Sequence, residues 1–239
     1  MESIVITENA LSEDNVLYMQ NTLSELFSNA GCTTGYTVAD DRVRLTVNCP
    51  EEFKDIVRAE ICDRAAEIVA VKYKYEFFKE NLFITGLSAV EKEILFAGLI
   101  AADFTDDKRY AFRRYNEQSE IALDGVYNFR LPPLKKKWKE VADYMPKVFV
   151  GAQLKEFISY MIEDRKKRVY VNGDNVYDAH YRVLRRRALL GGEGAAITRE
   201  VLLSGGGEVE LSGKIAEEDE FYLKQYFGDR IFFSPVAND

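Results

Sequence analysis

Apolar residues repeat with two different periods along this chain, and the change of period constrains its fold strongly. Between residues 13 and 30 they recur every three or four positions, as on one face of a helix, and this spacing returns between 88 and 161. Residues 43–47 alternate apolar with polar, and strand-like runs follow residue 169. The sequence therefore predicts an α+β fold with a small N-terminal α+β unit, a helical middle region and a C-terminal portion with short antiparallel strands.

The first predicted domain, residues 1–82, is acidic and combines strands with helices. We expect a strand at 4–6, a helix that Ser12 opens and Gly31 closes, and a hairpin formed by 36–39 and 43–47. Pro50 fits the start of a second helix, which is expected to run to about Lys79. These elements predict a three-stranded sheet with helices on one face.

The second predicted domain, residues 88–168, is helical. Ser88 and Glu91 have the spacing of a capping box, so a helix is expected to start there after a hinge at 83–86. Residues 105–107 are expected to cap a further helix, and Pro132–Pro133 to interrupt helix before another at about 135–145. A last helix carries Leu154 and Ile158 on its apolar face.

Residues 121–131 form an apolar run with one glycine and a Phe129-Arg130 pair, directly before a basic helix. The order acidic residue, glycine, hydrophobic residue and Phe-Arg-Leu resembles the YtxC-like sporulation proteins of spore-forming bacteria. That resemblance spans about residues 90–165 and implies a sporulation context, with no reaction and no catalytic residue. Val126 and Phe129 are expected to anchor the segment in the core, and Arg130 to pair with Asp124 or reach a ligand.

The third predicted domain, residues 169–239, is a strand-containing portion packed on the helical region. Residues 169–171 and 176–177 flank a turn and predict a hairpin. Two further strands are expected at 200–203 and 208–211, on either side of three glycines. A helix at 217–227 that ends at Gly228 and a final strand at 230–233 complete the prediction.

Residue types that carry catalysis or bind metal are scarce. The chain has three cysteines, Cys32, Cys49 and Cys62, at separations that fit no zinc motif, and we expect reduced thiols with Cys62 in the core. His180 is the single histidine and has no recognisable partner spacing. The sequence therefore predicts no catalytic residue, no metal site and no cofactor.

Two glycine-rich segments suggest phosphate loops, but a plainer interpretation is favoured for both. Residues 191–194 lack a convincing preceding strand, which favours a flexible connector over a phosphate-binding loop. At 212–214 the glycine spacing of a P-loop is missing, and Ile215 stands where a magnesium-binding hydroxyl belongs.

Positive charge is concentrated in the middle of an acidic chain. The net charge is −8, yet residues 105–190 hold 19 lysines and arginines against 12 aspartates and glutamates. Phosphate contacts need clustered cations, although a solvated basic face is the commoner meaning of such runs. The candidate polyanion-binding residues are Arg130, Lys135, Lys136, Lys137, Arg165, Lys166, Lys167, Arg168, Arg185, Arg186 and Arg187.

Taken with the resemblance, these patterns predict a noncatalytic protein that is associated with sporulation and acts through protein interaction or regulation, with a partner of unknown identity. The apolar runs are too short to cross a membrane, and the acidic start does not fit a signal peptide, so a cytoplasmic protein is expected. One alternative is a nucleic-acid-binding module that uses the basic middle region. The second is an enzyme that acts on a phosphorylated small molecule.

Overall fold

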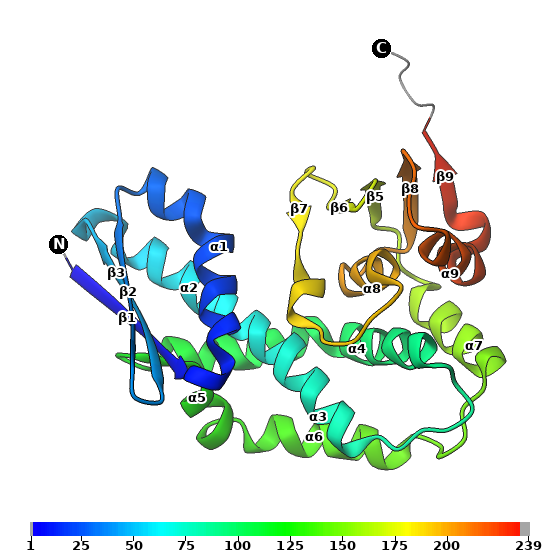
Figure 1. Ribbon diagram of the computed structural model, residues 1–239, viewed down its shortest axis with the longest axis horizontal. Coiled ribbons are helices and arrows are strands. Elements are labelled where there is room, and N and C mark those ends of the chain that lie inside the picture. Colours follow the sequence, from blue (N-terminus) through cyan, green and yellow to red (C-terminus); the bar gives the residue numbers. More distant parts are fainter. Residues whose placement is uncertain (1, 235–239) are drawn as a thin grey trace. The chain divides into compact units, whose positions relative to one another are not determined.

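A computed structural model describes residues 2–234 and confirms an α+β fold in which helices dominate (Figure 1). Among these residues two compact units are present. Unit 1 contains residues up to 74 and residues 105–140, and unit 2 contains residues 75–104 and those from 141 on. The three domains expected from the sequence follow one another along the chain, whereas each compact unit combines two separate stretches.

The sheet of unit 1 has the strand order β2-β3-β1-β4. Its strands are β1 (Glu2–Asn9), β2 (Thr33–Ala39), β3 (Arg42–Cys49) and β4 (Ile121–Ala122). β3 pairs antiparallel with both β1 and β2, while the short β4 pairs parallel with β1. The predicted first strand and hairpin are confirmed. β4 was not expected, because two residues carry no periodicity of their own.

The helices α1 (Glu13–Asn29) and α2 (Lys54–Ile68) supply much of the core of unit 1. Met19 and Ile61 are fully buried, as are Ile6 and Leu45 of the sheet. After α2 the chain makes a π-helical turn, Val69–Tyr73, and continues as α3 (Lys74–Asn81). The predicted helix after Pro50 is thus confirmed, and it begins with a short 3-10 turn, Glu51–Phe53.

Helix α4 (Ala89–Asn116) starts where the capping box predicts. Ser88 N–H donates to Glu91 Oε2 at 2.8 Å, and Glu91 N–H donates to Ser88 Oγ at 3.2 Å. The predicted second helix start at 105–107 is wrong, because α4 continues through these residues without a break. Asp107 does not cap a helix; its carboxylate is buried and bonded to other elements.

The segment that resembles the sporulation family forms α5 (Leu123–Phe129), and α6 (Pro132–Tyr144) follows. The two prolines occupy the first positions of α6, where no backbone N–H donor is needed, so the helix begins earlier than predicted. Val126 is 3% exposed and anchors α5, but Phe129 is 80% exposed. A core position for Phe129 is therefore wrong: α5 ends at this residue, so its side chain lies beyond the part of the helix that is packed.

The sheet of unit 2 has the order β7-β6-β5-β8-β9. It contains β5 (Arg168–Asn172), β6 (Asn175–Tyr177), β7 (Val183–Leu184), β8 (Glu208–Ser212) and β9 (Ile231–Phe233). The predicted antiparallel hairpin of β5 and β6 is confirmed, and Gly173 takes a positive φ of 54° in its turn. β8 instead pairs parallel with β5 and with β9.

Unit 2 also contains the helices α7 (Gly151–Ile162), α8 (Ala196–Leu203) and α9 (Glu217–Phe227). The predicted α7 and α9 are confirmed. The strand predicted at 200–203 is wrong, because these residues are the second half of α8. Val201, Leu202 and Leu203 are all buried, so the run shows no alternation of apolar and polar residues. A short apolar run of this kind does not distinguish strand from helix. None of the described helices has the length and apolar character that membrane crossing requires.

Candidate functional site

A fully buried ion pair lies in unit 1, between α3 and α4. Lys74 Nζ donates to Asp107 Oδ2 at 2.6 Å, and the two side chains are 0% and 1% exposed. Trp138 Nε1 donates to the same oxygen at 2.9 Å, and Lys137 Nζ donates to Oδ1 at 3.0 Å. Asp107 therefore receives donors on both oxygens, as a buried carboxylate requires.

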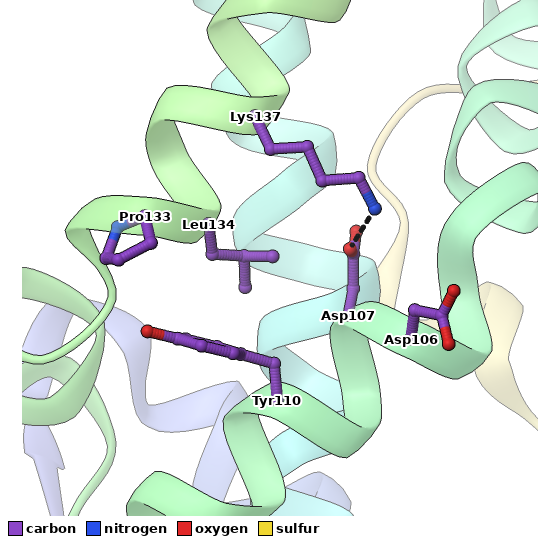
Figure 2. A pocket seen from close by; sticks show the side chains of 6 residues that line it. All are labelled: Asp106, Asp107, Tyr110, Pro133, Leu134 and Lys137. Atoms are coloured by element: carbon purple, nitrogen blue, oxygen red, sulfur yellow. Dashed lines mark hydrogen bonds and ion pairs between the residues drawn. The ribbon is translucent and has the colours of Figure 1, made fainter.

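A small open pocket of about 220 Å³ borders this ion pair (Figure 2). Lys137 extends from α6 toward Asp107, while the neighbouring Asp106 points away from it (Figure 2). Tyr110 and Leu134 supply apolar walls. Three donors of the protein bond the two oxygens of Asp107 at the edge of this pocket, so its carboxylate is held in place by the structure.

Stacked aromatic rings connect the ion pair to a second buried acid. The Tyr73 and Tyr127 rings stack with centroids 4.2 Å apart, and Tyr127 stacks on Trp138 at 6.4 Å. Lys135 Nζ lies 3.9 Å from the centroid of the Tyr127 ring. Burial lowers the pKa of this lysine. Tyr127, within the segment that resembles the sporulation family, is thus the middle one of three stacked rings. We call Tyr73, Tyr127 and Trp138 the aromatic column.

The second buried acid is Glu8, at the end of β1. Its Oε2 accepts hydrogen bonds from Tyr73 Oη at 2.6 Å and from Asn15 Nδ2 at 3.0 Å, and Oε1 accepts from Asn9 N–H at 2.8 Å. Burial raises the pKa of Glu8, and these donors oppose the shift without cancelling it. Within the described residues, Asn15 Oδ1 is buried without a hydrogen-bond partner. Sequence reasoning missed this cluster because Glu8 follows an apolar strand and belongs to no motif.

Four candidate polyanion-binding residues belong to unit 1. Two of them contact the unit itself, since Lys135 packs over the aromatic column and Lys137 binds Asp107. Arg130 and Lys136 are exposed. Arg130 does not pair with Asp124 as expected, because Asp124 Oδ1 accepts from Arg42 Nη2 at 3.0 Å.

The remaining seven candidates belong to unit 2, and several of them donate hydrogen bonds to backbone carbonyls. Lys167 Nζ donates to the carbonyl of Ser204 at 3.0 Å, and Arg186 Nη1 donates to that of Leu203 at 3.0 Å. These carbonyls lie at the C-terminal end of α8, where the helix dipole favours cations. Arg165 Nη2 also donates to a backbone carbonyl, that of Ala101 within α4, at 3.2 Å.

The other unit 2 candidates divide between partnered and exposed side chains. Arg168 forms ion pairs with Glu208 at 2.9 Å and Glu210 at 3.3 Å on the adjacent β8. Arg187 Nη2 donates to Asp174 O at 2.5 Å. Lys166 and Arg185 are exposed. Much of the basic excess therefore has structural partners, which leaves fewer cations for phosphate than the sequence suggests.

The glycine-rich residues 191–194 lie against carboxylates of unit 2. A Cβ added at Gly192 would collide with the Glu93 carboxylate, and Glu218 Oε2 accepts a hydrogen bond from Ala195 N–H at 2.7 Å. Asp219 Oδ1 accepts from Thr198 N–H at 2.8 Å at the start of α8. Side chains of the protein thus occupy the positions that an anionic ligand would need for a phosphate loop.

Strand β2 is the outer strand of the unit 1 sheet, with β3 as its neighbour. Its seven residues, Thr33–Ala39, contain no charge and no proline, and all are exposed except the partly buried Tyr36. The hydroxyl of Tyr36 donates to Glu13 Oε1 of α1. An edge strand of this length normally carries charges or a bulge that blocks pairing, so its composition is unusual.

His180 and the three cysteines differ in how far their side chains are exposed. His180 is exposed, while Cys49 and Cys62 are buried and Cys32 is partly exposed. Burial raises the pKa of Cys62 to about 11, which fits the expected core position. Across the described part of the chain, no group of three or more His, Cys, Asp or Glu side chains has the placement to hold a metal ion.

No family model, curated protein or solved structure matches this chain.

Proposed function

We propose that the protein acts without catalysis, by protein interaction, and that β2 is its binding element. The partner is a second copy of the chain, whose β2 adds antiparallel to the first. The observation that supports this proposal is that β2, an outer strand of its sheet, contains no charged residue and no proline. A role connected with sporulation, which the resemblance in residues 121–131 implies, and a cytoplasmic location, which the sequence predicts, are part of the same proposal.

The hairpin geometry identifies which backbone groups of β2 are available. Ala39 and Arg42 are register partners across the two-residue turn, so they form the closing hydrogen-bonded pair. Hydrogen-bonded and non-hydrogen-bonded pairs alternate along an antiparallel ladder. Thr34, Tyr36 and Val38 therefore direct their N–H and C=O groups away from β3, toward a strand added at the edge.

These three residues make the edge self-complementary. A two-fold axis beside Tyr36 would place Thr34 of each copy opposite Val38 of the other, with the two Tyr36 residues facing each other. β-branched and aromatic cross-strand pairs stabilise sheets, and no like charges would meet because β2 has none. Val38, which is 54% exposed, would gain apolar cover.

Sedimentation velocity of the purified full chain tests this proposal. We expect wild-type protein to sediment as a dimer at high micromolar concentration. Thr34→Pro should be monomeric, because proline removes an outward N–H and is tolerated on the open side of an edge strand. Thr33→Ala is the matched control: its N–H points toward β3, so it should remain dimeric.

Far-UV circular dichroism of each variant establishes that it is folded before its mass is interpreted. A wild-type chain that stays monomeric would overturn the proposal, even if another protein binds it. A folded Thr34→Pro variant that still dimerises would also overturn it, because the contact would then lie elsewhere.

A further inference from the structure

Cys32 and Cys49 face each other at the open end of the β2–β3 hairpin. Thr33 and Asn48 are register partners, so the next position along the ladder places Cys32 opposite Cys49. The two thiols interact: burial raises the pKa of Cys32, and the adjacent Cys49 raises it further. Cys49 is buried and Cys32 is partly exposed, so one thiol of the pair is accessible to a small reagent.

The ladder also determines which kind of pair the two cysteines form. Counting from the closing pair of the turn, Thr33 and Asn48 are a hydrogen-bonded pair, so Cys32 and Cys49 have the non-hydrogen-bonded geometry. Opposed Cα atoms in such a pair are about 4.5 Å apart, which lies within the roughly 4.4–6.8 Å that a disulfide spans. A bond between the two sulfurs therefore needs little backbone movement.

We propose that Cys32 and Cys49 are a redox pair that closes into a cross-strand disulfide when a peroxide oxidises the folded protein. The Cys32 thiolate attacks one peroxide oxygen, which forms a sulfenic acid and releases the other oxygen as water after protonation. The Cys49 sulfur then attacks Cys32 and displaces the sulfenic oxygen as a second water. Two thiols lose two electrons and two protons, and the peroxide is reduced to water.

The disulfide would join the start of β2 to the end of β3 and restrict the unfolded chain. Oxidation should therefore raise the midpoint of chemical denaturation, and dithiothreitol should reverse the rise. Because the thiolate is the reactive form, a raised pKa of Cys32 slows oxidation at neutral pH and makes the rate increase as the pH rises.

Hydrogen peroxide treatment, denaturation with alkylation of free thiols, and tryptic mass spectrometry test the pairing. Cleavage after Arg42 and Arg44 separates the cysteines, so a disulfide appears as two linked peptides, two hydrogens lighter than their sum. Wild-type protein and the Cys62→Ala control should both give this product. Cys49→Ala should not, and its denaturation midpoint should not rise.

A folded wild-type protein that retains three alkylatable thiols after peroxide treatment would overturn the proposal. So would linked peptides that contain Cys62 or two copies of Cys32. The test is independent of strand pairing between copies, since the linkage lies within one chain and forms equally in a monomer.

Discussion

Lys74 and Asp107 are separated by 33 positions in the sequence, yet Lys74 Nζ lies 2.6 Å from Asp107 Oδ2 with both side chains almost completely buried. Asp107→Asn should destabilise the protein by roughly 3 kcal/mol, because it removes the negative charge that lies against the buried Lys74 ammonium. Urea denaturation followed by circular dichroism measures the loss. The adjacent Asp106→Asn is the control: Asp106 is 73% exposed, and its loss should change stability by no more than about 0.5 kcal/mol. Equal midpoints for the two variants would contradict the structural role of Asp107.

Lys137 and Lys136 are neighbours on α6 with different surroundings. Lys137→Met removes a donor from the buried Asp107 carboxylate and should cost about 1 kcal/mol, a value reduced because the lysine side chain is 41% exposed. Lys136→Met should be nearly neutral, since its contact with Glu140 is long and exposed. Thermal unfolding of both variants at one ionic strength gives the comparison. Reversing the charge of Lys135, Lys136 and Lys137 together should therefore lower the free energy of unfolding as well as the positive charge.

Phe129→Ala should change the free energy of unfolding by less than about 0.5 kcal/mol, because the side chain is already 80% exposed. Val126→Ala, one turn earlier in α5, should cost about 2 kcal/mol through lost burial and a small cavity. Guanidinium titrations of the two variants provide the measurement. A larger loss at Phe129 than at Val126 would show that α5 packs differently.

Glu8 should make the protein less stable as the pH rises. Its pKa in the folded state is raised by burial, so between the unfolded value near 4.5 and the folded value the native state binds more protons than the unfolded state. The stability that Glu8 contributes is fully present below the unfolded pKa and is lost as the pH increases through the folded pKa. Glu8→Gln should flatten this part of the profile. Urea midpoints at several pH values, measured on both proteins, check the slope; an unchanged slope in the variant would assign the effect to another group.

Local signals predicted much of the fold. The Ser88–Glu91 capping box, the Pro50 helix start and the hairpin alternation at 43–47 each act within a few residues, and each is confirmed. The errors at 105–107 and 200–203 have different causes. Asp107 has the position of an acid at a helix start, but its carboxylate accepts hydrogen bonds from Lys74 and Trp138, which are distant in the sequence. Residues 201–203 are all buried, and a short apolar run of this kind does not distinguish strand from helix.

The candidate site was predicted less well than the fold. Runs such as 165–168 indicate charge but not partners, and only the structure shows that Arg168 pairs with β8 and Lys167 with the end of α8. The exposed edge of β2 also depends on sheet order, which no local pattern in residues 33–39 reveals. Parallel pairings such as β5 with β8 join distant residues, and that long-range information is absent from short windows.

Trp138 is the single tryptophan of the chain, and the structure places it fully buried against Tyr127 with its indole N–H bonded to Asp107. Emission excited at the red edge of its absorption band therefore originates from one location, the core of unit 1. Unit 2 contains no tryptophan and contributes to circular dichroism without contributing to that emission. Recording both signals during one denaturation would show whether the two units lose structure at the same denaturant concentration, without attaching a label to either.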